Sequence, residues 1–397
     1  MTSKKTLLLL LKNPFSPRDY ERMGIDALKK RFDLSILDCS SWLMPQSMRR
    51  RKVHPSICDE VVHINSLKAF LQFVAKTPAG VAIDYVGQFS AQAILMFHLL
   101  KRAGFRIAVL DSGSIALPQE WRRVNLSWQG LVYAYKSRVL ARALSKLGRS
   151  LMLRALPDQS PDIALVAGTS WQSNPRFASA GTKILAHSFD YEKFRRVNAE
   201  GLISGGPGWA LYIDENLPSH EDNGELGYEI PVTFERFSIS IKRFFDQFEQ
   251  ESGLRIRIAA YPASRSDEYY KKLFGDRDVV FGKTAELIKG AAVVFAHAST
   301  AISFAVLWRR PLVFLASEEL RNSWYMPWVL APQRVLQAPL VDIDDASAGS
   351  ALVSSGLTID ADRYAHYENT FLRAQAASDA SIWEIFSQGV DACCPNS

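Results

Sequence analysis

Short apolar strands alternate with polar helical segments between residues 255 and 308, and this pattern constrains the fold more than any other feature of the chain. The predicted strands of this stretch span 255–260, 278–281 and 292–296. Short buried strands separated by helices form parallel sheets, which bind ligands at the carboxyl ends of their strands. Ser299 and Thr300 open the last helix of the stretch, where free backbone N–H groups favour an anion. The pattern predicts a phosphate or nucleotide site in the second half of an α/β protein.

The same alternation extends over the rest of the chain. The first half is predicted to hold strands at 6–11, 33–37, 81–85, 106–110, 162–166 and 183–186, and helices at 17–31, 66–74 and 90–103. The second half is predicted to add strands at 209–213 and 311–315, a long helix at 233–250 and a closing helix at 364–386. The glycine-rich stretch 201–208 is the predicted linker. We therefore expect one domain over 1–200, a second over 209–363, and a C-terminal helix and tail over 364–397.

Length and composition are those of a globular protein with two cores. The chain has 397 residues, of which 48% are hydrophobic and 22% charged. No apolar run approaches the roughly 20 residues of a membrane span, and the N-terminus lacks the features of a signal peptide, so we expect a cytoplasmic protein. The four cysteines, Cys39, Cys58, Cys393 and Cys394, lack metal-ligand spacing, and we expect no metal and no disulfide framework.

Positive charge is concentrated in one region of the chain. Between Gln119 and Leu156 there are eight Arg or Lys residues and a single acid, Glu120, with aromatic and apolar residues interleaved. Such a helix suits an anionic membrane surface or an anionic acceptor. A solvated helix face packed by its apolar side is the alternative. No nucleic-acid motif is present, so we expect no nucleic-acid partner.

Two acids directly follow the strand that opens the second half. Asp214 and Glu215 come after 209–213 and beside the predicted linker. A carboxylate in this position would act as a general base on an acceptor hydroxyl or as a nucleophile on an anomeric carbon. Ordinary solvated acids in a turn are the alternative. The next acids and histidine, in 220–222, have no specific metal-ligand spacing.

Further polar residues are predicted at the same edge of the sheet. Tyr261 and Pro262 end one strand, and His297 follows another, just before Ser299 and Thr300. Together these side chains would hold one phosphate, although a hydrogen-bonded structural histidine and plain helix caps would look the same. Other matches are weaker. Gly282-Lys283-Thr284 lacks the first glycine of a P-loop, since Arg277 stands there, and Asp342-Ile343-Asp344 lies late in the chain for a metal-binding pair.

The run from Ala210 to Leu315 resembles bacterial surface-polysaccharide glycosyltransferases of the GT-B type that use CMP-activated ulosonic acids, most closely the retaining β-Kdo transferases of O-antigen and capsule assembly. The matching motifs are Asp214-Glu215, Tyr261-Pro262 and Ser299-Thr300. The resemblance implies two Rossmann-like doubly wound domains that face a cleft, with a C-terminal helix that closes back. Tyr261 stands where the family has a histidine that contacts the donor phosphate, and it cannot carry positive charge near neutral pH.

The function implied by this resemblance is transfer of a CMP-activated ulosonic acid, Kdo or sialic acid, to a surface-polysaccharide or lipid-linked glycan acceptor. Asp214 would be the nucleophile or the base, with Glu215 beside it. The donor would be bound by Tyr261, Pro262, Arg265, His297, Ser299 and Thr300, without a metal. The basic region 119–156 would bring the protein to the inner face of the cytoplasmic membrane. Alternatives are a UDP-sugar transferase or epimerase of the same fold, and a non-catalytic scaffold of polysaccharide assembly.

Overall fold

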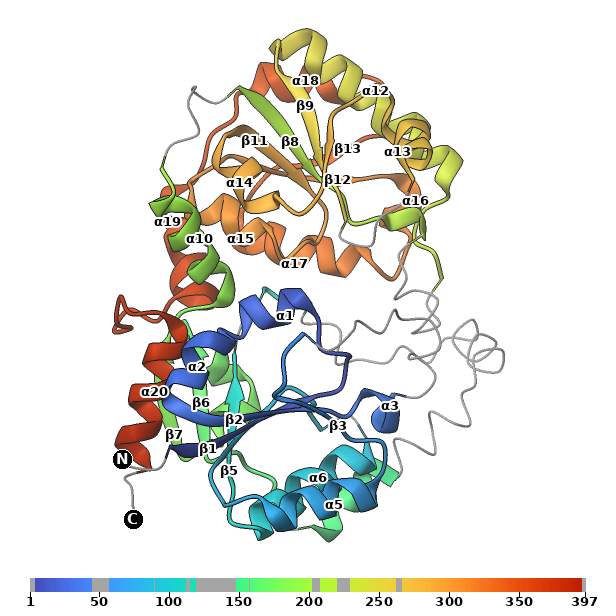
Figure 1. Cartoon of the computed structure of the whole chain (residues 1–397). Helices are drawn as coiled ribbons and strands as arrows, with labels where there is room; N and C mark the ends of the chain where they lie inside the picture. Colours follow the sequence, from blue (N-terminus) through green and yellow to red (C-terminus); the bar gives the residue numbers. More distant parts are fainter. Residues whose placement is uncertain are drawn as a thin grey trace. The chain divides into compact units, whose positions relative to one another are not determined.

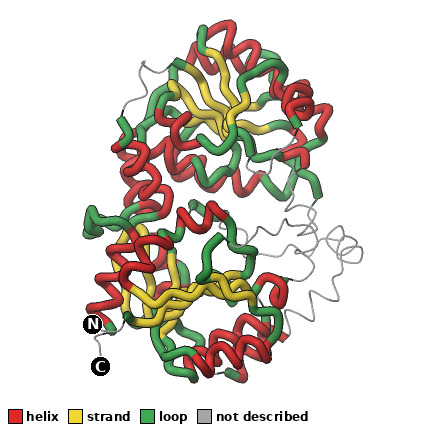
Figure 2. The backbone as a smooth tube through the Cα atoms, viewed as in Figure 1, coloured by secondary structure: helices red, strands yellow, loops and turns green. Residues whose placement is uncertain are grey.

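A computed structural model describes residues 4–44, 57–88, 90–111, 115–118, 148–156, 158–201, 208–219, 229–261 and 266–394. The chain forms two compact units. Unit 1 consists of Met1–Ser112, Asn125–Phe189 and Ala374–Ser397, and unit 2 of Gly113–Val124 and Asp190–Arg373. Each unit contains one parallel sheet with helices on both faces (Figures 1 and 2). The predicted linker falls mostly on 202–207, outside the described residues, and the predicted domain boundaries remain a prediction.

The sheet of unit 1 has seven strands in the order β3-β2-β1-β4-β5-β6-β7, all parallel. The strands are β1 (Lys5–Leu11), β2 (Phe32–Asp38), β3 (Val61–His63), β4 (Val81–Asp84), β5 (Arg106–Leu110), β6 (Ile163–Ala167) and β7 (Thr182–Ala186). The chain builds β2 and β3 on one side of β1 and then continues with β4 on the other side. The order of the strands therefore reverses between β1 and β4, which makes this a switch point of the sheet.

The five consecutive leucines of β1 explain why this strand lies at the centre. Leu7, Leu9 and Leu11 point to the core shared with α2 and α20, and Leu8 and Leu10 to the core shared with α5 and α6. Successive side chains of a strand point to opposite faces, so an unbroken apolar run suits a strand that is covered on both sides. Each buried leucine stabilises the fold by about 1.5–3 kcal/mol relative to an exposed one.

The labelled helices in the described part of unit 1 are α1 (Pro17–Arg22), α2 (Ile25–Arg31), α3 (Ser40–Leu43), α5 (Leu67–Lys76), α6 (Ala91–Arg102), η2 (Ser170–Ser173), α9 (Pro175–Ala178) and α20 (Ile382–Cys393). Residues 148–155 are helical as well. The single helix predicted over 17–31 is wrong. The helix stops at Arg22, and Gly24 adopts a left-handed conformation with φ +54° before α2 begins. Glycine tolerates this conformation because it has no Cβ.

The sheet of unit 2 has six parallel strands in the order β10-β9-β8-β11-β12-β13. They are β8 (Trp209–Ile213), β9 (Arg255–Ala259), β10 (Val279–Val280), β11 (Ala291–Ala296), β12 (Leu312–Ala316) and β13 (Leu340–Asp342). Its switch point lies between β8 and β11, because the chain builds β9 and β10 on one side of β8 before it places β11 on the other.

The helices of unit 2 are most of α10 (Phe189–Ala199), then η3 (Leu217–Ser219), α12 (Phe234–Ser252), α13 (Asp267–Phe274), α14 (Thr284–Lys289), α15 (Ile302–Leu307), α16 (Glu318–Arg321), α17 (Met326–Leu336), α18 (Ala348–Ser355), α19 (Ala361–Tyr367) and the π-helical turn η4 (Glu368–Leu372). Phenylalanines fix α12 on the sheet. The rings of Phe244 and Phe248 pack edge-on against Phe295 of β11, with centroids 5.4 and 5.0 Å apart. Such a pair adds about 0.5–1.5 kcal/mol to the burial of its area.

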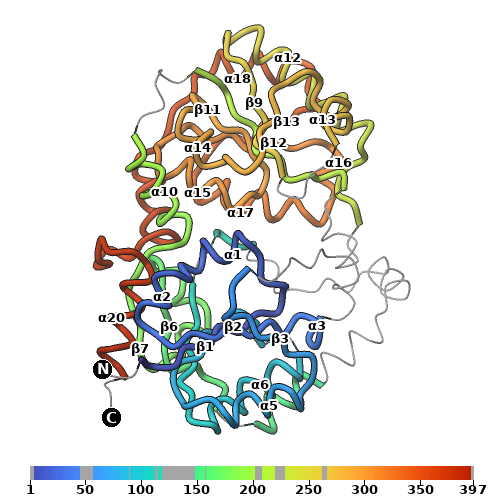
Figure 3. The backbone as a smooth tube through the Cα atoms, viewed as in Figure 1, coloured from blue at the N-terminus to red at the C-terminus, as the bar shows by residue number. Residues whose placement is uncertain are grey.

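The C-terminal segment returns to the first sheet, as predicted, but not as one helix. The helix predicted over 364–386 is wrong, because α19 and η4 end at Leu372 and α20 starts only after the capping residue Ser381. Figure 3 shows α20 (red) beside α2 (blue) in unit 1. An ion pair of 2.7 Å between Lys5 and Asp391 joins the two ends of the described chain.

Candidate functional site

The predicted acids lie at the switch point of the second sheet. Asp214 and Glu215 directly follow β8, and the loop 297–301 directly follows β11. The two strands are hydrogen-bonded neighbours, with Tyr212 paired to Phe295, so their carboxyl ends meet. Asp214 and Glu215 are only 4% and 7% exposed. These acids are therefore parts of a buried cluster and not solvated turn residues.

Glu215 holds the loop that follows β11. Its carboxylate accepts hydrogen bonds from the backbone N–H groups of His297, at 3.2 Å, and of Ala298, at 2.8 Å. The hydroxyl of Tyr325, which precedes α17, donates a third hydrogen bond. Burial raises the pKa of Glu215 from 4.5 to about 7, and the three donors, with Tyr325 the strongest, oppose this rise. Burial therefore holds the pKa of Glu215 above the usual value of a glutamate.

His297 is a neutral residue of the core in this arrangement. It is completely buried, and its Nδ1 lies 2.8 Å from the carbonyl oxygen of Leu315, which only accepts hydrogen bonds. Nδ1 therefore carries the proton, and Nε2 accepts from the hydroxyl of Tyr212 at 3.1 Å. Burial lowers the pKa of His297 to about 4. Both ring nitrogens are engaged, so the phosphate contact predicted for His297 would need a rearrangement of these bonds.

Backbone donors orient the carboxylate of Asp214. One oxygen accepts from the N–H of Asn216 at 2.8 Å and the other from the N–H of Tyr261 at 3.4 Å. Asn216 has a left-handed backbone, with φ +51°, and its side-chain oxygen accepts hydrogen bonds from the hydroxyls of Ser219 and Tyr269. This conformation is uncommon for a residue with a side chain, and the buried network around Asn216 holds it in place. The acidic pair is thus presented by a rigid turn.

Ser299 and Thr300 lie in the turn before α15, not inside the helix. The six-residue helix begins at Ile302, and the Ser299 hydroxyl accepts a hydrogen bond from the N–H of Ala301 at 3.2 Å. Ser299 is half-buried and Thr300 exposed. Their own N–H groups donate no hydrogen bond within the described ranges, whereas the N–H groups of His297 and Ala298 are taken by Glu215. Tyr261 is half-buried, with its N–H on Asp214.

Several predicted features fall where the chain is not described. Pro262 and Arg265 lie outside the described residues, as do 220–222 and most of the basic region, 119–147. Of the basic residues that are described, Arg149 donates a hydrogen bond of 2.7 Å to the carbonyl of Gln88. Among the described residues no helix has the length and apolar character needed to cross a membrane.

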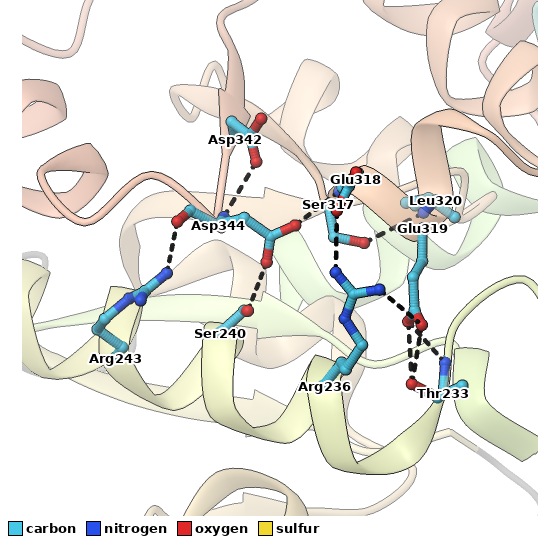
Figure 4. A network of polar contacts seen from close by, with 10 residues as sticks. All are labelled: Thr233, Arg236, Ser240, Arg243, Ser317, Glu318, Glu319, Leu320, Asp342 and Asp344. Atoms are coloured by element: carbon cyan, nitrogen blue, oxygen red, sulfur yellow. Dashed lines mark hydrogen bonds and ion pairs between the residues drawn. The ribbon is translucent and has the colours of Figure 1, made fainter.

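The Asp342-x-Asp344 pair is part of a structural network (Figure 4). The carboxylate of Asp344 accepts from the Ser240 hydroxyl and from the N–H of Glu318, and so ties α12 to α16. Asp342 accepts from the N–H of Asp344 at 3.0 Å. Within the described part of the chain no three His, Cys, Asp or Glu side chains gather as a metal-ligand set.

Three tyrosines of the site escape sequence reasoning. Tyr325 binds Glu215, Tyr212 binds His297, and Tyr269 binds Asn216. Tyr212 is a buried strand residue and Tyr269 a residue of α13, so both read as ordinary core positions. Nothing in the local sequence marks these tyrosines as partners of the site, since their contacts come from residues far along the chain.

Comparison with known proteins identifies the fold. Neither a protein family nor a curated protein sequence matches the chain. Solved structures do match over nearly the whole length. The S. aureus MnaA–UDP structure has a TM-score of 0.52 and 9% identity, covering 98% of this chain and 96% of the other. A UDP-glucosyltransferase from Polygonum tinctorium has a TM-score of 0.51 and 11% identity, covering 99% and 98%. Phytolacca americana UGT2 with UDP-2fluoro-glucose and pterostilbene has a TM-score of 0.50 and 9% identity, covering 98% and 99%.

The chain therefore has a GT-B-like fold of two doubly wound α/β units, as the sequence predicts. At such low identity the similarity defines the fold and not the reaction. That the two domains face a cleft stays a prediction.

Proposed function

We propose that this protein is a glycosyltransferase that takes its sugar from a nucleotide-activated donor. The observation that carries the proposal is the buried, oriented acid pair Asp214-Glu215 at the switch point of the second sheet. Open α/β sheets bind their ligands at such switch points. The similarity in fold to a UDP-glucosyltransferase and to proteins solved with UDP or a UDP-sugar analogue agrees with this reaction class.

Asp214 is the reacting carboxylate of the proposed mechanism. In a retaining reaction one Asp214 oxygen bonds to the anomeric carbon while the bond from that carbon to the phosphate oxygen breaks, and the nucleotide leaves with the electron pair. The acceptor hydroxyl then attacks the glycosyl-enzyme, gives its proton to the phosphate of the nucleotide that has left, and frees Asp214. In an inverting reaction Asp214 takes the proton of the acceptor hydroxyl directly. The resemblance of the motifs favours retention.

Glu215 positions the donor side of the same site. Its hydrogen bonds to the N–H groups of His297 and Ala298 fix the turn that carries Ser299 and Thr300. The N–H groups of these two residues and the Ser299 hydroxyl are the proposed contacts of the donor phosphate, together with Tyr261. Preorganised donors of this kind stabilise the charge that develops on a leaving nucleotide. No metal is needed in this proposal.

Two donor classes remain in the proposal, each for its own reason. The order of Asp214-Glu215, Tyr261-Pro262 and Ser299-Thr300 favours a CMP-activated ulosonic acid, Kdo or sialic acid. The solved structures of similar fold that contain UDP or UDP-2fluoro-glucose favour a UDP-sugar. The proposed acceptor is a surface polysaccharide or a lipid-linked glycan. Liposome co-sedimentation tests membrane contact through 119–156, and binding that ignores anionic lipid would contradict it.

A thermal-shift screen with CMP, UDP, GDP and NAD tests the donor class. The wild type is compared with the Ser299→Ala/Thr300→Ala double variant, which removes the Ser299 hydroxyl of the proposed phosphate contact and the neighbouring Thr300 hydroxyl. Stabilisation by CMP that is reduced in the variant supports the ulosonic-acid donor and leads to assays with CMP-Kdo and CMP-sialic acid. Stabilisation by UDP supports a UDP-sugar as the donor instead. Nucleotide binding without turnover of any donor, or no binding at all, would favour the non-catalytic scaffold instead.

A further inference from the structure

Unit 1 has a pocket of its own at the switch point of the first sheet. It has a volume of about 200 Å³ and lies where β1 and β4 end. Its lining residues are Leu11, Lys12, Asn13, Asp19, Arg22, Met23, Tyr85 and Phe189. Taking about 30 Å³ per water molecule, the space equals roughly seven waters, which suits a ligand of the size of one sugar ring.

The charged groups of this pocket favour an anion. Lys12 and Arg22 contribute two positive charges, and Asp19 is the one acid among the lining residues. Asp19 is already engaged in the capping box of α1, because its carboxylate accepts hydrogen bonds from the backbone N–H and the hydroxyl of the N-cap residue Ser16. The guanidinium of Arg22 donates no hydrogen bond to any residue that the structure describes.

Tyr85 contributes a hydroxyl that has no hydrogen-bond partner among the described residues. Its oxygen is buried and finds no hydrogen-bond partner in the described part of the chain. Burial raises the pKa of Tyr85, and the negative charge of Asp19 raises it further. The positive charge of Arg22 opposes this rise but its effect is smaller than that of burial, so the hydroxyl stays protonated. A buried polar group without a partner costs about 1–3 kcal/mol. A ligand oxygen that accepts from Tyr85 would remove this cost.

The fold holds Arg22 in place before any ligand arrives. Its guanidinium carbon lies 4.6 Å from the centre of the Phe189 ring, and its carbonyl oxygen accepts a hydrogen bond of 3.1 Å from the indole of Trp383. The same indole packs against Gly24, where a Cβ would lie only 2.1 Å from Trp383 Cδ1. The turn between α1 and α2 is therefore clamped by α20, which lowers the entropic cost of binding.

We infer that this pocket binds a sugar-sized ligand through a carboxylate or phosphate group, with Arg22 and Tyr85 as donors to that group and Met23 and Phe189 against its apolar side. The described residues that line this pocket all belong to unit 1, and the inference does not depend on the reaction proposed for unit 2. If this ligand is the acceptor, a step that does rest on the proposed function, the acceptor is an acidic or phosphorylated glycan.

Methyl NMR of the full chain with ¹³C-methyl-labelled methionine tests this inference. Met23 lines the pocket, and Met96, in the core on the other face of the first sheet, is an internal control. The Met23 signal, assigned with Met23→Leu, is followed during titration with glucuronate, glucose 6-phosphate, inorganic phosphate and neutral glucose. We expect the sugar anions to shift the Met23 signal while the Met96 signal stays, and glucose to shift neither. Glucuronate and glucose 6-phosphate separate the carboxylate from the phosphate source.

Two arginine variants of the same helix separate a site from general attraction. Arg22→Ala removes the pocket guanidinium, and Arg18→Ala removes an exposed charge from α1 outside the pocket. We expect Arg22→Ala to weaken binding about tenfold or more, as for the loss of a charged hydrogen bond, and Arg18→Ala to change it less than about twofold. Equal weakening in both variants, or no shift of Met23 with any anion, would overturn the inference.

The same spectra test the pocket of unit 1 and the proposed function of unit 2 independently. Met326 follows Tyr325 and reports on the acid cluster of unit 2. A response of Met326 to CMP or UDP without a response of Met23 to sugar anions would leave the proposed function standing and overturn the inference. The reverse result would leave the pocket standing and contradict nucleotide binding at unit 2.

Discussion

The carboxyl edges of the two sheets share one topology and differ in their chemistry. At the edge of unit 2, Glu215 and His297 are buried, and both are matched by donors and acceptors of the protein itself. At the edge of unit 1, Arg22 and Tyr85 line an open pocket, and the Tyr85 hydroxyl has no partner among the described residues. The topology thus decides where a site can form, and the side chains decide whether it is already closed or still lacks a partner.

This difference has a consequence for each site. The carboxyl edge of unit 2, the matched edge, should be rigid, since moving Glu215 would leave the backbone N–H groups of His297 and Ala298 without an acceptor. It suits a carboxylate that must stay in one position through a reaction. The carboxyl edge of unit 1, the unmatched edge, should be stabilised most when a ligand supplies an acceptor for the Tyr85 hydroxyl. Five substitutions test this contrast.

Asp214→Asn should have the largest effect. It keeps the shape of the side chain but removes the charge and the nucleophilic oxygen, so we expect glycosyl transfer to fall by about 10²–10⁴-fold or more. The rate is measured with whichever donor the thermal-shift screen identifies. Asp276→Asn, at an exposed position of the same unit, should leave the rate unchanged. Near-normal activity of Asp214→Asn would remove Asp214 from the mechanism.

Gly24→Ala should be the most destabilising of the structural changes. Both Gly24 and Gly253 have left-handed φ angles, +54° and +70°, but of the two only Gly24 faces a ring, since a Cβ added there would lie 2.1 Å from Trp383 Cδ1. We expect a loss of about 2–5 kcal/mol for Gly24→Ala, from the backbone cost plus the clash with the indole. Gly253→Ala, with no atom within 4 Å, should show the backbone cost alone, about 1–2 kcal/mol.

The measurement is the free energy of unfolding in urea, together with anion binding at Met23. Because Trp383 also holds the carbonyl of Arg22, Gly24→Ala should weaken anion binding in the protein that remains folded. Equal destabilisation by the two alanines would show that Trp383 yields to the new methyl group.

The fold could be predicted from the sequence where elements are long and periodic. The leucine run 7–11 is an unbroken apolar stretch and the helix α12 carries a clear helical period, and both lie where the sequence places them. The strands β3 and β13 were not predicted, since three residues are too few to show a period. The breaks at Gly24 and after Leu372 come from tertiary packing and from a π-helical turn, and the local pattern continues through both.

The position of the candidate site could be predicted from the sequence, but the hydrogen bonds within it could not. A strand followed by Asp214 and Glu215 marks an edge of a parallel sheet without any structural information. The partner of Glu215 is Tyr325, far along the chain, and no periodicity or spacing connects them. His297 was predicted as a phosphate contact because a histidine after a strand looks the same whether its ring points to a ligand or to Tyr212.

Glu215→Gln should change how stability depends on pH. Burial raises the pKa of the Glu215 carboxyl from 4.5 to about 7, so between these values the folded state should bind more protons than the unfolded state. Stability from this group is therefore present at low pH and lost as pH rises through 7, by about 3 kcal/mol at most. His297, with a pKa lowered to about 4, contributes the opposite slope below 6.5. Glutamine removes only the first of these contributions.

The free energy of unfolding is measured in urea from pH 4.5 to 8 for both proteins. The free energy of unfolding of Glu215→Gln, relative to that of the wild type, should rise by about 1–3 kcal/mol between pH 4.5 and pH 8. A difference that stays constant with pH would mean that Glu215 does not titrate in the neutral range.

Tyr325→Phe removes one donor from the matched edge. At pH 8 it should cost about 1–3 kcal/mol, because an ionised, buried Glu215 loses the hydrogen bond that most favours its charge. At pH 5 the cost should be smaller, since Glu215 is then protonated. Tyr269→Phe is the matched control, because its hydroxyl binds the neutral side chain of Asn216. Its cost, about 1 kcal/mol, should not depend on pH. A pH-independent cost for Tyr325→Phe would argue against a titrating Glu215.

Tyr85→Phe makes the same chemical change at the unmatched edge, and here we expect the opposite sign. The hydroxyl that it removes is buried without a partner in the described chain, so its loss should leave stability unchanged or raise it by up to about 1 kcal/mol. The cost should appear only when the ligand is present, as a weakening of sugar-anion binding by about threefold to tenfold in the Met23 titration. Destabilisation of the free protein by 1 kcal/mol or more would show that the hydroxyl already has a partner, such as an ordered water. In that case the two edges would differ in charge but not in how completely their polar groups are matched.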